Sequence, residues 1–166
     1  MSEILRSIRN YINHPNQRIA IDQLCAECES ELRDNPNLGM AYRVVSPELV
    51  LSGPGSPMKS LWVFAFKPGG ESDIHKHSNS TQYSCTWKGR GNFRVGDPHN
   101  AREISLIEQS TNNDPHTDWL VIAPGTFHHA IASEEGWSVV SFHTVPARAL
   151  QDEPFEGEAH HYVTGN

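Results

Sequence analysis

The chain has 166 residues, 37% of them hydrophobic, which is enough for one domain with a core and too few for two. Its formal net charge of −7 at pH 7 argues against a nucleic-acid partner and against an acidic membrane surface. No apolar run in the sequence approaches the length of a membrane span.

The N-terminal part, residues 1–38, is predicted to be a helical segment. Apolar residues recur at helical spacing over residues 2–13 and again over residues 16–34. Pro15 separates the two helices, and the Asn-Pro-Asn sequence at residues 35–37 ends the second one. The first helix mixes isolated apolar residues with arginines, so we expect no signal peptide.

The cysteines indicate a compartment but no site. Three cysteines, an odd number, fit a reduced environment better than a disulfide scaffold, so we expect a cytoplasmic protein. Cys25 and Cys28 form a C-x-x-C sequence in the second predicted helix, with no second cysteine pair to complete a zinc site. We interpret both as core or surface thiols.

Residues 39–147 are predicted to form a mainly β domain. Short β runs alternate with Gly, Pro and Asn, which is typical of an antiparallel barrel or jelly roll. The remaining residues, 148–166, are polar and acidic, and we expect a tail or a strap. Edge strands of a small barrel aggregate unless they are covered, and a homodimer would cover them. The nine predicted runs are Met40–Val45, Leu49–Ser52, Ser60–Lys67, Gln82–Lys88, Gly91–Val95, Glu103–Gln109, Trp119–Ile122, His129–Ala132 and Trp137–Val145.

Three histidines predict a metal site. His75 and His77 are separated by one residue, so in a strand both side chains point to the same face. Gln82 follows after a turn, and His128 lies far along the chain. First-row divalent ions accept imidazole nitrogen at about 2.0–2.2 Å. We predict one mononuclear site with the three histidines as ligands, and with Gln82 as a fourth ligand or as a hydrogen-bonding partner of a bound molecule. We expect His129, the next residue, to point away from it.

The spacing resembles the two motifs of the cupin superfamily. In the first motif a glycine precedes His-x-His by five residues, and a glutamate and a second glycine follow. Here Gly69 is followed by His75–His77 and by Gly89 at that spacing, but Gln82 replaces the glutamate. The second motif resembles residues 124–128, with the proline displaced by one position. The resemblance implies a single cupin double-stranded β-helix, a jelly-roll barrel.

The glutamine changes the charge expected at the metal. Where the cupin glutamate would bring a negative charge, Gln82 brings a neutral amide. A divalent ion held by three neutral imidazoles keeps roughly its full +2 charge. Such a centre favours an anionic partner such as hydroxide, a thiolate, an enolate or a carboxylate.

Two segments resemble the three-histidine thiol dioxygenases of the superfamily. Residues 74–80 are similar to their Ile-His-Asp-His-Thr-Asn-Ser run, and residues 141–145 to their Ser-x-His-x-Tyr sequence, with Val145 in place of tyrosine. The resemblance implies that His143 orients a bound substrate or dioxygen. Arg43 is the nearest candidate for their substrate-binding arginine, although it is one residue out of phase.

The favoured function is a non-haem Fe(II) dioxygenase that acts on a small anionic molecule, a thiol among the candidates, with O₂ as co-substrate. Its catalytic residues would be His143, Gln82 and Arg43. Zinc, manganese and nickel are the other metals that the ligands suit. A Zn- or Mn-dependent isomerase or lyase, and a non-enzymatic sensor or small-ligand module, are the alternatives. The aromatic residues expected to supply pocket walls, of which only some can face inward, are Phe64, Phe66, Tyr83, Trp87 and Trp137.

Overall fold

Two helices precede the barrel in a computed structural model that describes residues 2–45, 57–107 and 119–156. Helix α1 spans Glu3–Asn13 and α2 spans Pro15–Asp34, close to the predicted bounds. Ser2 caps α1, since its Oγ accepts a hydrogen bond from the backbone N–H of Leu5 at 3.3 Å. No helix among the described residues is long and apolar enough to cross a membrane.

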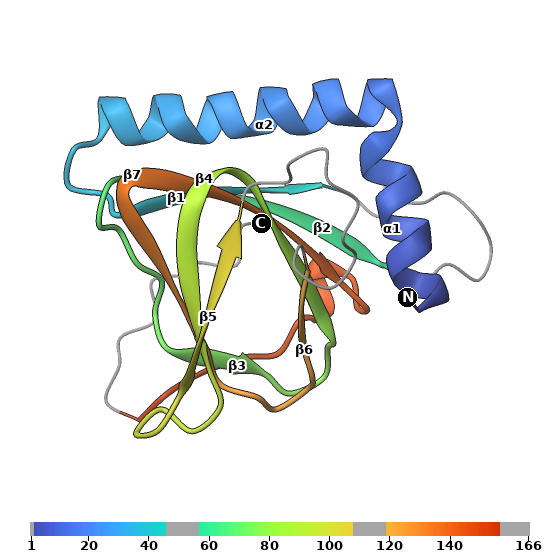
Figure 1. Ribbon diagram of the computed structural model, residues 1–166, viewed down its shortest axis with the longest axis vertical. Helices are drawn as coiled ribbons and strands as arrows, with labels where there is room; N and C mark the ends of the chain where they lie inside the picture. The colour runs from blue at the N-terminus through green and yellow to red at the C-terminus, as the bar shows by residue number, and fades with distance from the viewer. Residues whose placement is uncertain (1, 46–56, 108–118, 157–166) are drawn as a thin grey trace.

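The strands form a curled antiparallel sheet, as the sequence predicts. They are β1 (Met40–Val45), β2 (Ser60–Phe66), β3 (His75–His77), β4 (Gln82–Val95), β5 (Arg102–Ile107), β6 (Leu120–Ile122), β7 (His128–His143) and β8 (Asp152–Pro154), and a short 3₁₀ helix spans Ala147–Ala149. The order β1-β2-β7-β3-β8 is completed by β4, which pairs with β5, β6 and β7. Strand β7 thus pairs with β2, β3 and β4, which lets the sheet close on itself (Figure 1). The architecture is a single jelly-roll barrel with N-terminal helices.

Two pairs of predicted strands are each one long strand. The runs Gln82–Lys88 and Gly91–Val95 join as β4, whose pairing with β7 shifts register on either side of Gly89. The runs on either side of Gly136 join as β7. Both glycines have positive φ, +73° and +80°, and they kink strands that continue, where the sequence suggested turns.

Other predicted runs differ at their ends or cannot be compared. The run Leu49–Ser52 lies outside the described residues, as does the end of the run Glu103–Gln109. Strand β8 was not predicted, because three residues within a polar, acidic segment carry no strand pattern. Of the predicted tail, residues 157–166 lie outside the described part of the chain.

The alternation of side chains along β2 separates its apolar residues into those that face the helices and those that face the barrel interior. Leu61 and Val63 of β2 face a core that includes Ile8, Ile12 and Ile21 of the helices. The alternate residues of β2 face the barrel interior. Figure 1 shows α2 lying across one side of the barrel, α1 running beside it, and β3 on the side away from α2. The helices therefore cover the outside of the sheet and leave the interior to the site.

Candidate metal centre

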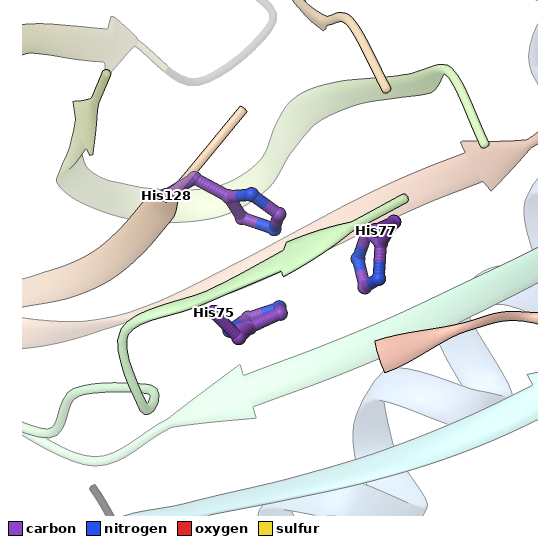
Figure 2. Close-up of side chains that lie close together, drawn as sticks. All are labelled: His75, His77 and His128. Atoms are coloured by element: carbon purple, nitrogen blue, oxygen red, sulfur yellow. The ribbon is translucent and has the colours of Figure 1, made fainter. Parts of the chain in front are cut away.

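The barrel brings the three predicted histidines together. His75 and His77 stand on one face of β3, separated by Lys76, and His128 begins β7 directly opposite His75 in the antiparallel pairing. All three side chains are buried, with exposed fractions of 6%, 7% and 3%. Their rings turn toward a common space between the two strands (Figure 2). The alternation of side chains along β3 and the pairing of β3 with β7 therefore bring the three histidines together.

The geometry of the cluster suits one ion. One nitrogen from each imidazole lies within 4.8 Å of the other two. The ring centroids of His75 and His128 are 4.2 Å apart, and that of His77 lies 5.0 Å from each. Three donors bound to one ion at about 2.1 Å lie about 3.0 to 3.6 Å apart, so a shift of less than about 1 Å by each nitrogen completes the coordination. A three-histidine metal-binding site is therefore present.

Backbone carbonyls orient two of the rings. The Nδ1 of His75 lies 2.8 Å from the carbonyl oxygen of Asp73, and the Nδ1 of His128 lies 3.1 Å from that of Thr126. Each Nδ1–H donates to its carbonyl, which leaves each Nε2 with a lone pair for a metal. This arrangement is the usual hydrogen-bonding support of a metal-binding imidazole.

Several buried polar atoms at the histidine cluster lack a hydrogen-bond partner, and a bound metal ion would compensate for this. Within the described residues, His77 Nδ1, His128 Nε2 and Gln82 Oε1 are buried and form no hydrogen bond. Such atoms are rare in proteins because each costs free energy. A cation bound between the rings would satisfy the nitrogens, so these residues fit a metal ion.

Burial keeps two of the imidazoles neutral. It lowers the pKa of His75 from 6.5 to about 4, against a smaller opposing effect of Asp152. Burial likewise holds the pKa of His128 well below its ordinary value, and the neighbouring histidines add to that effect. Since only neutral imidazole binds a metal, these two ligands need not release protons near pH 7.

Gln82 lines the same cavity. Its side chain is 4% exposed, and its Nε2 donates a hydrogen bond to Ser84 Oγ at 2.8 Å. Ser84 in turn shares a hydrogen bond of 2.8 Å with Ser141. The serines fix the amide, and the role of Gln82 as a ligand or hydrogen-bonding partner stays a prediction.

His143 stands beside the cluster. It ends β7 opposite Gln82, is 2% exposed, and its ring centroid lies 4.9 Å from that of His77. Its Nδ1 lies 3.4 Å from Ser80 Oγ. Burial, and then the proximity of His77 and His75, hold its pKa well below the ordinary value. The structure thus brings a neutral fourth imidazole to the site.

Arg43 is not brought to the site. In β1 it pairs with Val63 and shares the outward face that α2 covers, whereas the adjacent Tyr42 shares the face of Phe64. The guanidinium contacts Glu27 at 3.2 Å and Glu31 at 2.7 Å, both in α2. Arg43 misses the site because it is one residue out of phase with the family's arginine. Side chains alternate along a strand, so a one-residue difference places Arg43 on the opposite face of β1.

A small cavity of about 40 Å³ adjoins the histidines. One water needs about 10–15 Å³ of such a cavity, so there is room for an ion and a few light atoms. The predicted walls Phe64 and Phe66 line it, whereas Tyr83 belongs to the helix-facing core. Trp87 donates a hydrogen bond to Asp22 of α2, so it too faces the helices. The cavity's aromatic lining is Trp62, Phe64, Phe66 and Phe93.

A C-terminal strap, defined here as residues 146–155, lines part of the cavity and was missed as part of the site. Its strand β8 pairs with β3, and Leu150 and Asp152 line the cavity. Asp152 lies across from His77 in the pairing. One acidic residue in an acidic segment gives no sequence signal, so only the pairing of β8 with β3 reveals it.

His129, adjacent to a ligand, faces away as expected. Its Nε2 lies 3.2 Å from Glu71 Oε2, and it does not line the cavity beside the three histidines. The alternation of side chains along β7 separates the two neighbouring imidazoles.

Comparisons with solved structures identify the fold. The coconut allergen cocosin aligns with a TM-score of 0.55 and 16% identity over 71% of this chain and 29% of that one. A point variant of Bacillus subtilis oxalate decarboxylase aligns with a TM-score of 0.55 and 18% identity, over 72% of this chain and 29% of that one. A formate complex of Lactobacillus farciminis oxalate decarboxylase aligns with a TM-score of 0.54 and 16% identity, over 70% of this chain and 31% of that one. The chain thus spans about a third of the length of these structures.

The comparisons support the cupin resemblance at the level of fold. No protein-family model matches the sequence, and no curated protein matches it either. The similar structures include both decarboxylases and an allergen, so the fold does not determine a reaction. The protein has the cupin fold, a jelly-roll barrel, and carries a three-histidine metal site inside it. The similarity to thiol dioxygenases stays a prediction.

Proposed function

We propose that the protein is a mononuclear non-haem Fe(II) dioxygenase that acts on a small molecule. The observation that carries this proposal is a cluster of three buried imidazoles beside a small cavity with aromatic walls. Three protein ligands on one side of an ion leave positions for a substrate and for O₂. A ferrous ion held there would supply the electron density that dioxygen needs in order to react.

The residues around the cavity would exclude water and move a proton. Trp62, Phe64 and Phe66 form an apolar wall against bulk solvent. His143 is neutral, and its Nδ1 faces Ser80, which leaves Nε2 to accept a proton from a substrate group bound beside His77. The buried amide of Gln82 would orient the substrate by a hydrogen bond.

The cavity limits the substrate. A volume of about 40 Å³ favours a small substrate. Among the described residues that line the cavity there is no lysine or arginine. An anionic substrate group would therefore be held by the ion itself, which favours thiolates, enolates and small carboxylates as candidates.

A second function is favoured by His143. An imidazole whose ring lies 4.9 Å from a ligand ring is positioned to act as a general base beside a carbonyl polarised by zinc or manganese. That arrangement would serve an isomerase or lyase, which consumes no oxygen.

The test combines metal analysis with oxygen uptake. The protein, purified without a histidine tag, would be loaded anaerobically with Fe(II) and offered a panel of small thiols, enols and carboxylates under O₂. We expect about one iron per chain, bound through the three-histidine site, and substrate-dependent oxygen consumption. Turnover of a panel compound without oxygen consumption, with zinc or manganese bound, would replace the dioxygenase by the isomerase or lyase.

A matched pair of neighbouring residues controls the site assignment. His128→Ala removes a ligand and should abolish stoichiometric metal binding, while His129→Ala, one residue further along β7, should keep it. Circular dichroism of both variants would check that the barrel is folded. Full metal occupancy in the His128→Ala protein would contradict the ligand set.

A further inference from the structure

The C-terminal strap places a carboxylate at the histidine cluster. Strand β8 pairs with β3 so that Asp152 lies opposite His77, and the Asp152 side chain is 17% exposed and lines the cavity. None of the cupin motif residues supplies a carboxylate, because position 82 is glutamine. The segment that does supply one lies 70 residues further along the chain, from Gln82 to Asp152.

The distances place the carboxylate beside two of the three histidines, although the group whose ligand atoms all lie within 4.8 Å of one another contains the histidines alone. Asp152 Oδ1 lies 3.4 Å from His77 Nδ1 and 4.0 Å from His75 Nε2. Two donors that share one ion at about 2.1 Å are about 3.0 to 4.2 Å apart for angles between about 90° and 180°. Both separations fall in this range, so an ion held by the histidines can take Asp152 as a further ligand after a small shift of the carboxylate toward His128.

A hydrogen bond from His77 explains the contact less well. N–H···O hydrogen bonds are typically about 2.7–3.2 Å long, shorter than the 3.4 Å found here. Within the described chain, His77 Nδ1 forms no hydrogen bond. The separation of 3.4 Å is that of two ligands of one cation.

We propose that Asp152 is the fourth protein ligand of the metal centre and supplies the negative charge that Gln82 does not. The inference rests on the metal site of the proposed function and is independent of the reaction at that site. Carboxylate oxygen is an ordinary ligand of first-row divalent ions, alongside imidazole. An ion with four protein ligands keeps fewer open positions, which favours a substrate that binds through a single atom.

Contacts on both sides of Asp152 hold the carboxylate in place. Asn79 donates to the carbonyl oxygen of Ala149 at 2.7 Å and accepts from the backbone N–H of Gln151 at 3.0 Å. Ser78 Oγ donates to the Gln151 side chain at 2.9 Å, and beyond Asp152 the N–H of Phe155 donates to Ile74 at 2.9 Å. A ligand fixed on a paired strand is preorganised, so binding costs little ordering.

Cobalt binding provides the test, because Co(II) reports its ligands by visible absorption. Asp152→Asn keeps the size of the side chain and removes its charge. The matched control is Glu153→Gln, since Glu153 is the next residue, is half exposed and pairs with Lys76 at 3.2 Å. Asp152→Glu restores the charge on a longer side chain. Co(II) affinity would be measured by competition with a chelator, and the spectrum recorded at saturation.

We expect Asp152→Asn to weaken Co(II) binding by about 10- to 100-fold and to change the visible spectrum. Glu153→Gln should leave both unchanged, and Asp152→Glu should recover part of the affinity. Wild-type affinity and spectrum in the Asp152→Asn protein would overturn the assignment, as would equal losses in the Asn and Glu variants. If the cobalt results hold but no oxygen is consumed with iron, only the proposed reaction fails. Absence of cobalt binding by the wild-type protein would remove the metal centre itself.

Discussion

At the scale of single residues, Gln82 leaves the metal site without the carboxylate that the cupin motif has at this position. The sequence implied an ion with uncompensated charge, and hence an anionic partner. In the structure, a carboxylate from the strap lies 3.4 Å from His77, while the Gln82 amide is held by Ser84. The charge of the centre therefore depends on a segment outside both motifs.

Replacing Gln82 by glutamate tests this charge balance. Gln82→Glu adds a negative charge beside the cluster at almost constant volume, so a divalent metal should bind at least as tightly. An anionic substrate should bind more weakly, because the ion then carries less net positive charge. Metal titrations and the KM of the substrate identified by oxygen uptake would measure both effects. An unchanged KM would place Gln82 outside the substrate site.

At the scale of elements, the sequence predicts what is local and misses what depends on pairing. The helices could be predicted because their periodicity lies in consecutive residues. The histidine cluster, which depends on a strand pairing, could be predicted only because two separate segments resemble the two cupin motifs. Strand β8 could not be, because its three residues become a strand only by pairing with β3. Gly89 and Gly136 suggested turns because a local signal cannot distinguish a turn from a kink within a continuing strand.

The contact between β1 and α2 gives a prediction for Arg43. This arginine binds two glutamates of α2, and its side chain is 34% exposed. Because half-exposed ion pairs contribute little, Arg43→Ala should lower the free energy of unfolding by at most about 1 kcal/mol. Metal affinity should not change. Chemical denaturation and metal titration of the same variant would show this, and a loss of substrate binding with intact stability would restore Arg43 to the site.

At the scale of the whole molecule, the residues of the metal site lower the stability of the metal-free fold. Four histidines converge inside the barrel, and all four are buried polar groups: His75, His77, His128 and His143. Burying a polar side chain costs free energy unless a partner compensates. The barrel tolerates this cost because apolar clusters under the helices and inside the sheet stabilise the fold around the site.

The metal-free protein should lose stability as the pH falls from about 6.5 toward 4. His75 has a pKa of about 4 in the folded chain and 6.5 ordinarily, so in this range the unfolded chain binds a proton that the folded chain does not. The stability that neutral His75 contributes above pH 6.5 is therefore lost as the pH falls toward 4. Protonation of His128 acts in the same direction. Urea midpoints of the metal-free protein at several pH values would measure the loss.

The His75→Gln protein serves as the comparison, because it lacks one of the titrating groups. Its urea midpoint should fall less steeply over the same pH range than that of the wild-type protein. Equal slopes for the two proteins would show that His75 does not resist protonation in the folded state.

The long pairing of β4 with β7 has a mechanical consequence. One end of this ribbon carries Gln82 and His143, and the other end carries His128 opposite Val95. These ends meet at one cavity although the ribbon spans the barrel, so its curvature sets the spacing between His128 and His143. The kinks at Gly89 and Gly136 lie between the two ends. A side chain added at Gly89 or Gly136 would therefore change the distance between His128 and His143, although neither glycine contacts the metal site.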